Sequence, residues 1–355
     1  MKYILAIDSF KGCLSSAGAE EAVEKAIHDA EPGAEVFRLP VSDGGEGMLD
    51  AFMSLSDGTR HKLLVRDAMM RHVEAEYGIS ADGTAFIESA ASCGLTLIEP
   101  ELRSPVRATS YGVGELVADA VRRGCRNFII GLGGSAVSDA GIGMLRALTD
   151  AFADGGTMDD ALRGVLGLCR FTLASDVRNP LYGPDGAACV YGPQKGASPA
   201  DVVMLDNRAR RFADFSARHF GYDRSSEPGA GAAGGLGYAF MQYLGATVHS
   251  GADLLLDMAG FDAMLGDASC VITGEGRADR QTLMGKLPGR VLSRARAAGV
   301  PVWLIAGSVA DVPELLEAGF SRVEAVTPAS MDTAEALRPD TARANISETI
   351  KRLMI

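Results

Sequence analysis

The stretch N-F-I-I-G-L-G-G-S-A-V-S-D-A-G-I-G-M-L, from Asn127 to Leu145, contains a fold signal and a candidate ligand site. Phe128 to Ile130 is typical of a short buried strand, and the apolar residues after the turn predict a helix. Between them, Gly133 and Gly134 allow positive φ and let a ligand approach the backbone closely. A turn that presents N–H groups beside the start of a helix suits a phosphate or a carboxylate. The same residues also fit a tight strand-to-helix turn that binds nothing.

The composition is that of a globular protein, with 355 residues of which 47% are hydrophobic and 23% charged. This length suits two domains. The formal net charge of −12 argues against nucleic acid and anionic membranes as partners. No run approaches the roughly 18 apolar residues of a membrane span, and the N-terminus does not resemble a signal peptide. The cysteines and histidines show no zinc-ligand spacing, so we expect a cytoplasmic protein with reduced thiols.

Strands and helices alternate at both ends of the chain, which predicts a doubly wound parallel sheet. The predicted strands are Tyr3–Ile7, Glu35–Leu39, Cys270–Thr273, Pro301–Ala306 and Val323–Val326. The predicted helices include Met48–Leu55, Leu287–Ala298 and Pro313–Ala318.

The pattern changes near Gly58. The segments His61–Val65, Val73–Ile79 and Thr84–Ile87 alternate as antiparallel strands do, with a hairpin signal at Ala81-Asp82-Gly83. We therefore expect an inserted α/β domain with a mixed sheet. The expected division is a Rossmann-like domain over residues 1–58 and 255–355, an inserted domain over 59–254, and an active-site cleft between them.

Polar, glycine-containing turns are expected to follow four strands of the first domain, at 8–11, 42–46, 273–276 and 307–308. In an open α/β sheet these turns share the ligand-binding edge. Polar turns of the inserted domain, at 133–139, 176–179 and 194–195, would form the opposite wall. Carboxylates together with Lys11, Lys195 and Lys286 suit phosphoryl transfer, because acids bind magnesium and lysines neutralise phosphate oxygens.

Each of these residues also has a simpler interpretation. Asp8 and Asp43 could cap helices, and Lys11 and Lys195 could be solvated surface charges. Glu275 lies between two glycines directly after an apolar strand, where a charge without a partner is costly, and this favours a functional role.

The motifs taken together resemble the bacterial ATP-dependent glycerate kinase family. They are D-S-F-K-G from Asp8, S-D-G-G-E-G from Ser42, G-L-G-G-S-A from Gly131, D-V-R-N-P-L from Asp176, G-P-Q-K-G from Gly192, P-G-A-G-A-A-G-G-L-G from Pro228 and G-E-G-R-A-D-R-Q-T-L-M-G-K-L-P from Gly274. They occur in the family's order, and the resemblance extends from Met1 to about Gly307.

The resemblance implies two domains, ATP and Mg²⁺ as cofactors, and D-glycerate as substrate, with 2-phosphoglycerate as the usual product and 3-phosphoglycerate the lesser alternative. By motif it also implies the site residues. Expected catalytic residues are Asp176 as first choice for the base, Asp43 as second choice, Lys11 and Lys195. Expected substrate or phosphate ligands are Asp8, Ser9, Gly133, Gly134, Ser135, Asp139, Asn179 and Lys286. Glu275 and Asp279 are the expected metal ligands, and Glu46 belongs to the same motif set.

The sequence departs from the family pattern close to the predicted site. Val137 to Gly141 reads V-S-D-A-G, where the family more often has T-N-D-G-G, and the segment from Leu148 to Phe171 is short. These departures bear on substrate choice more than on reaction type. A kinase of another small hydroxy acid, such as tartronate or a longer aldonate, and a non-catalytic nucleotide or organic-anion sensor are the alternatives. The sequence does not specify an oligomeric state.

Overall fold

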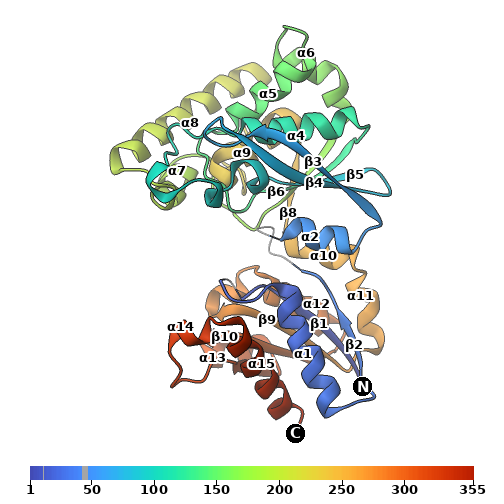
Figure 1. Ribbon diagram of the computed structural model, residues 1–355. Coiled ribbons are helices and arrows are strands. Elements are labelled where there is room, and N and C mark those ends of the chain that lie inside the picture. The colour runs from blue at the N-terminus through green and yellow to red at the C-terminus, as the bar shows by residue number, and fades with distance from the viewer. Residues whose placement is uncertain (11, 42–46) are drawn as a thin grey trace. The chain divides into compact units, whose positions relative to one another are not determined.

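The computed structural model describes residues 1–10, 12–41 and 47–355 (Figure 1). Contacts divide the chain into unit 1, which comprises Met1–Asp43 and Ala252–Ile355, and unit 2, which comprises Gly44–Gly251. No helix in the described part of the chain is both long and apolar enough to cross a membrane.

Unit 1 is built on a parallel sheet with the strand order β11-β10-β9-β1-β2. The strands are β1 (Lys2–Ile7), β2 (Glu35–Arg38), β9 (Cys270–Ala278), β10 (Val302–Val309) and β11 (Arg322–Ala325). Numbered along unit 1, this is the doubly wound order 2-1-3-4-5, whose direction reverses between β1 and β9. Unit 2 is inserted in the connection from β2 to β9.

Helices cover both faces of this sheet. They are α1 (Ser16–Ala30), α10 (Gly251–Met258), α11 (Phe261–Met264), α12 (Leu287–Ala297), α13 (Val312–Ala318), α14 (Thr333–Ala336) and α15 (Pro339–Leu353). Strand β1 is apolar throughout because its alternate residues meet different helices. Leu5 and Ile7 pack with α1 and α15, whereas Ile4 and Ala6 pack in the cluster that contains α12.

Unit 2 contains a mixed sheet with the order β3-β4-β5-β6-β7-β8. Its strands are β3 (Gly58–Arg66), β4 (His72–Ser80), β5 (Thr84–Glu88), β6 (Asn127–Gly131), β7 (Arg170–Ala174) and β8 (Thr247–His249). Strands β3 to β5 are antiparallel and β5 to β8 are parallel. The predicted fold class, a doubly wound parallel sheet from both chain ends plus an inserted α/β unit with a mixed sheet, is therefore confirmed.

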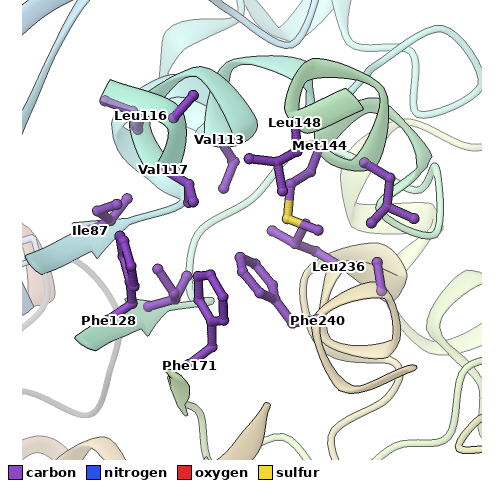
Figure 2. Packing of buried hydrophobic residues seen from close by; sticks show 14 of the residues in the cluster. Ile87, Val113, Leu116, Val117, Phe128, Met144, Leu148, Phe171, Leu236 and Phe240 are labelled. Atoms are coloured by element: carbon purple, nitrogen blue, oxygen red, sulfur yellow. The ribbon is translucent and has the colours of Figure 1, made fainter. Parts of the chain in front are cut away.

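The helices of unit 2 are α2 (Met48–Ser54), α3 (Ala90–Cys93), α4 (Tyr111–Arg122), α5 (Ile142–Phe152), α6 (Met158–Arg163), α7 (Ala187–Tyr191), α8 (Pro199–Phe220) and α9 (Ala232–Leu244). Figure 2 shows how α4, α5 and α9 pack their apolar side chains onto β5, β6 and β7. The rings of Phe128 and Phe171 stack with centroids 4.7 Å apart, and Phe240 of α9 lies 5.4 Å from Phe171. This core fixes β6, and with it the glycine-rich turn that follows.

Helix α2 corrects the predicted boundary at residue 58, because it belongs to unit 2. Phe52 stacks on Phe86 of β5 with ring centroids 4.7 Å apart, and the Leu49 N–H donates to Glu88 Oε1 at 2.7 Å. Gly78 of β4 lies directly beneath Met53. Apolar periodicity indicates that α2 has a buried face, but it does not show which sheet that face covers.

Strands β9 and β10 are longer than predicted, so the expected turns at 273–276 and 307–308 are wrong. Glu275 pairs with Ala306, and the ladder continues to the pair Ala278 and Val309. The glycines serve close packing instead of a turn. A Cβ at Gly274 would lie 2.4 Å from the Ile305 carbonyl oxygen, and one at Gly307 would lie 2.6 Å from that of Gly276.

Candidate functional site

A pocket of about 510 Å³ lies at the edge of the unit 1 sheet where β1, β9 and β10 end. Ligands of open α/β sheets bind beyond the carboxyl ends of the strands, where the strand order reverses, and this edge is that place in unit 1. The polar part of its lining includes Asp8, Ser9, Glu275, Arg277, Lys286 and Ser308. Four predicted site residues, Asp8, Ser9, Glu275 and Lys286, are thus brought together from the two ends of the sequence.

Glu275 is a buried carboxylate whose two oxygens both have partners. It is 6% exposed, accepts a hydrogen bond from Thr282 Oγ1 at 2.6 Å, and pairs with Lys286 Nζ at 2.9 Å. Lys286 precedes α12 as its N-cap residue, so the helix start fixes its backbone beside Glu275. The partner that the sequence could not identify for Glu275 is therefore Lys286, and the pair presents a charge-compensated polar surface to the pocket.

Asp8 lies beside Glu275 because β1 and β9 are in parallel register. Ile7 pairs with Gly274, and the Asp8 N–H donates to the Gly274 carbonyl at 2.9 Å. The Asp8 carboxylate in turn accepts the Ser9 N–H at 2.7 Å. Magnesium is commonly bound by one or two carboxylates together with waters and phosphate oxygens, and this neighbouring pair fits that donor set. Among the described residues, no three His, Cys, Asp or Glu side chains are grouped closely enough to bind a metal ion by themselves.

Asp279, the other predicted metal ligand, is not part of the pocket lining. It caps the short helix Arg280–Leu283, where Oδ1 accepts the Gln281 N–H at 2.9 Å, and it lies 3.5 Å from Arg277 Nε. The structure therefore gives Asp279 a capping position, and its metal role stays a prediction. Lys11, Asp43 and Glu46 lie outside the described residues.

The other predicted residues lie in unit 2, at the edge where its parallel strands end. The register pairs Glu88 with Gly131, Gly131 with Ala174, and Ala174 with His249. The glycine-rich turn after β6 and the segment of Asp176 after β7 therefore start at the same edge.

The glycine-rich turn is held by α3 and the residues that follow it. Gly134 has φ 72°, its carbonyl accepts the Leu95 N–H at 2.8 Å, and the Ala136 N–H donates to the Cys93 carbonyl at 2.8 Å. The apolar residues after the turn form α5, which begins at Ile142, so the helix predicted there is confirmed.

Asp139 occupies the start of α5. Its Oδ2 accepts the Ser110 N–H at 2.8 Å, Ser110 Oγ–H at 2.9 Å and the Gly143 N–H at 3.0 Å, while Oδ1 accepts the Gly141 N–H at 3.0 Å. The protein thus places its own carboxylate where the helix dipole would favour an anion. This arrangement fixes the turn, and the predicted contact of Asp139 with substrate stays a prediction.

Lys195 is buried beneath the same turn. It is 4% exposed, and its Nζ donates to the Val137 carbonyl at 2.7 Å and to Ser135 Oγ at 3.3 Å. Burial lowers the pKa of Lys195 to about 8, although nearby Cys93 and Asp139 oppose the shift. Two predicted residues, Ser135 and Lys195, are therefore in direct contact, and Lys195 stabilises the turn from inside.

Asp176 and Asn179 have different environments in the loop after β7. Asp176 is exposed. Asn179 uses its side chain within the loop, because Nδ2 donates to the Asp185 carbonyl at 2.8 Å and Oδ1 accepts the Tyr191 hydroxyl at 2.8 Å. Of the two, Asp176 has the exposure that a group acting on substrate requires.

The backbone around the turn is strained. Ala140 and Ala233 have φ of 55° and 49°, and the Ala140 N–H donates to the carbonyl of Gly234, which has φ 66°. Ala140 stands where the family pattern has glycine, yet it keeps the left-handed conformation. Residues held in such conformations cluster at functional sites.

Some features of these edges were not predicted. Within the described residues, the buried hydroxyls of Ser89, after β5, and Ser138, in the turn, have no hydrogen-bond partner, which costs stability. Arg277 lies inside the G-E-G-R motif, so the motif could have indicated it. The pocket wall from Val326 to Ala342 carries no motif and gave no sequence signal.

Gly234 and Gly245 form a matched pair for testing the close contact behind the turn. Their φ angles are 66° and 65°, but a Cβ at Gly234 would lie 1.9 Å from the Val137 carbonyl oxygen, whereas one at Gly245 would have nothing within 4 Å. We predict that Gly245→Ala costs about 1 kcal/mol of unfolding free energy, from the left-handed backbone alone. Gly234→Ala should cost about 3 kcal/mol, because overpacking adds to the same strain. Denaturant unfolding measures both, and equal losses would contradict the close contact.

Lys195 predicts a specific pH dependence of stability. Its pKa is about 8 in the folded chain and 10.5 as the reference value, so between these values the unfolded chain binds more protons and stability rises with pH. Relative to Lys195→Met, the wild-type free energy of unfolding should increase by about 2 kcal/mol from about pH 7.5 to about pH 9.5. Denaturation of both proteins across this range measures the difference. If the unfolding free energies of the two proteins changed with pH in parallel, burial would not lower the pKa of Lys195.

Comparison with known proteins supports the same family across the chain. A model of the glycerate kinase family matches residues 3–355. The chain is 40% identical to glycerate 2-kinase of Escherichia coli (strain K12) over 328 residues, covering 88% of this chain and 86% of that protein. It is 38% identical to glycerate kinase of Bacillus subtilis (strain 168) over 358 residues, covering 95% and 93% of the two chains.

A solved structure gives the same result. The crystal structure of a Salmonella typhimurium LT2 protein, named only provisionally as glycerate kinase 2, matches with a TM-score of 0.83 and 36% identity, covering 100% of this chain and 97% of that one. The family resemblance predicted from the motifs is confirmed: this chain belongs to the glycerate kinase family.

Proposed function

We propose that the protein is a D-glycerate kinase that transfers the γ-phosphoryl group of ATP to the 2-hydroxyl of D-glycerate. The observation that carries this proposal is the family match over residues 3–355. Membership of a kinase family implies ATP as phosphoryl donor. The Escherichia coli relative is named as a glycerate 2-kinase, which supports 2-phosphoglycerate over 3-phosphoglycerate as product. We also propose a cytoplasmic location, which suits six free thiols.

In the proposed reaction, the glycerate hydroxyl oxygen forms a bond to the γ-phosphorus, and the bond from that phosphorus to the bridging oxygen of ADP breaks. The hydroxyl proton passes to a carboxylate, for which Asp176 is the first choice and Asp43 the second. Asp176 is exposed at the edge of unit 2, as a base that meets substrate must be. The proton transfer accounts for part of the rate, and positioning with charge neutralisation accounts for the rest.

The remaining predicted residues are assigned to binding. Lys11, Lys286 and Ser9 are proposed to meet phosphate oxygens or the substrate carboxylate directly, and Asp8 to meet phosphate through bound Mg²⁺. Gly133, Gly134 and Ser135 are proposed to bind an anion through the turn. Lys195, Asp139 and Asn179 are proposed to position that turn and its neighbouring loop, since their polar atoms bond to the protein itself.

Asp8 and Glu275 are the proposed magnesium ligands, with Asp279 as the further predicted one. When bound, Mg²⁺ would neutralise charge on the phosphate chain. Lys286 compensates the charge of Glu275, so the polar part of the pocket can accept an anion without two uncompensated carboxylates facing it.

The assignment of Asp176 predicts a specific loss of activity. Asp176→Asn should lower kcat for D-glycerate by about 100-fold or more, because the hydroxyl loses its proton acceptor. Asp185→Asn is the matched control, since it removes a carboxylate from an exposed residue of the same segment and should leave kcat nearly unchanged. A coupled ADP-release assay measures both variants. Full turnover by Asp176→Asn would transfer the base role to another residue.

The same assay tests the function itself. D-Glycerate should give stoichiometric ADP, and phosphorus NMR of the product should show 2-phosphoglycerate. Turnover with tartronate or a longer aldonate but not with D-glycerate would indicate a different hydroxy-acid kinase. Nucleotide binding with no turnover of any of these acids would indicate a sensor.

A further inference from the structure

The unit 1 pocket has an apolar part that phosphate binding does not explain. Phe10, Cys13, Val326, Met331, Leu337 and Ala342 line it beside the polar residues at the strand ends. Leu337 is 46% exposed, so the pocket leaves a large apolar side chain in contact with solvent. An apolar wall next to a charged edge indicates a ligand with one apolar end and one charged end.

The size of the pocket favours ATP over D-glycerate as its ligand. The pocket volume of about 510 Å³ lies in the range of sites that enclose drug-sized ligands, roughly 300 to 1,000 Å³. A three-carbon hydroxy acid is much smaller and is polar at every carbon, so it would leave the apolar wall in contact with water. A purine nucleoside combines a flat apolar ring system with ribose hydroxyls, and it matches both the size and the wall.

The polar part of the lining suits the phosphate end of such a ligand. Arg277 and Lys286 supply cations whose side chains are 73% and 40% exposed. Lys286 also pairs with Glu275, so this part of the pocket is not dominated by negative charge. Ser308 and Thr327 add hydroxyls.

We propose that this pocket in unit 1 is the nucleotide site, with the base and ribose on the wall formed by Phe10, Met331 and Leu337 and the phosphates beside Lys286 and Arg277. The inference rests on the proposed function for its choice of ATP as ligand, and it adds where the nucleoside binds. It also assigns a role to the segment from Val326 to Ala342, which no sequence motif marks. Helix α14 contacts the loop after β1 through Cys13, whose thiol donates to the Ala336 carbonyl at 3.8 Å.

A pair of tryptophan variants in α14 tests the site. Ala336 lines the pocket, whereas Ala334 lies on the same short helix, is exposed and is not part of the lining. Ala336→Trp should fill the apolar part and raise KM for ATP at least about 10-fold, because the nucleoside loses its contact surface, while KM for D-glycerate changes less than about 2-fold. Ala334→Trp should leave both constants nearly unchanged. An unchanged KM for ATP in Ala336→Trp would overturn the proposal.

Protection of cysteines from alkylation tests the proposed nucleotide site in the protein without any substitution. Cys13 lines the pocket and Cys189 of unit 2 does not, yet both are partly exposed and burial raises the pKa of both thiols. ADP with Mg²⁺ should slow alkylation of Cys13 by iodoacetamide at least about 5-fold at alkaline pH, as site occupancy excludes the reagent. Alkylation of Cys189 should not change, and D-glycerate alone should protect neither thiol.

Different results would contradict the nucleotide site and the proposed glycerate kinase activity. Turnover of D-glycerate without protection of Cys13 would overturn the nucleotide site and leave the proposed function standing. Protection of Cys13 by ADP without turnover of D-glycerate would support the nucleotide site and contradict the glycerate kinase activity. Equal protection of Cys13 and Cys189 would indicate a general effect of nucleotide and would overturn the site.

Discussion

The parallel pairing of β1 with β9, and of β9 with β10, is the constraint on which the pocket depends. It brings Asp8 beside Glu275 and Glu275 beside Ala306, although these residues come from opposite ends of the sequence. Gly274 and Gly307 make the long ladders possible, because a Cβ at either position would collide with a neighbouring carbonyl. If the strands ended after Thr273 and Ala306, as their apolar runs suggest, Glu275 would not be fixed in the sheet.

The two units use buried charge in different ways. In unit 1, Glu275 is compensated by Lys286 and stays at the wall of a pocket. In unit 2, Asp139 bonds to Ser110 and to the start of α5, and Lys195 bonds to Ser135 and to the Val137 carbonyl. Charged residues that bond inward in this way hold the strained backbone of the turn in place.

The sequence predicts most helices and strands correctly, because the apolar periodicity of each one lies in a short, continuous stretch of residues. It identified the family, because seven motifs occur in the chain in the family's order. The sequence did not show that α2 belongs to unit 2, because helical periodicity does not indicate which sheet a helix covers. It also took Gly274 and Gly307 for turn residues, because a glycine required by close packing and one required by a turn look the same in a sequence.

The candidate site was predicted in part for a related reason. Asp8, Ser9, Glu275 and Lys286 stand in motifs, and they line one pocket. The polar contacts of Asp139 with Ser110 and the apolar wall around Leu337 depend on residues distant in sequence that carry no motif. Such contacts are set by packing, and only the folded chain shows them.

The central claim is that the edge where β1, β9 and β10 end binds the phosphoryl donor. Hydrogen exchange of the backbone amides, followed by mass spectrometry with and without ADP and Mg²⁺, tests it most directly. The account predicts slower exchange in peptides that contain Cys13, Glu275 and Leu337. Slowing confined to peptides of the turn around Ser135, with none at these three positions, would contradict it.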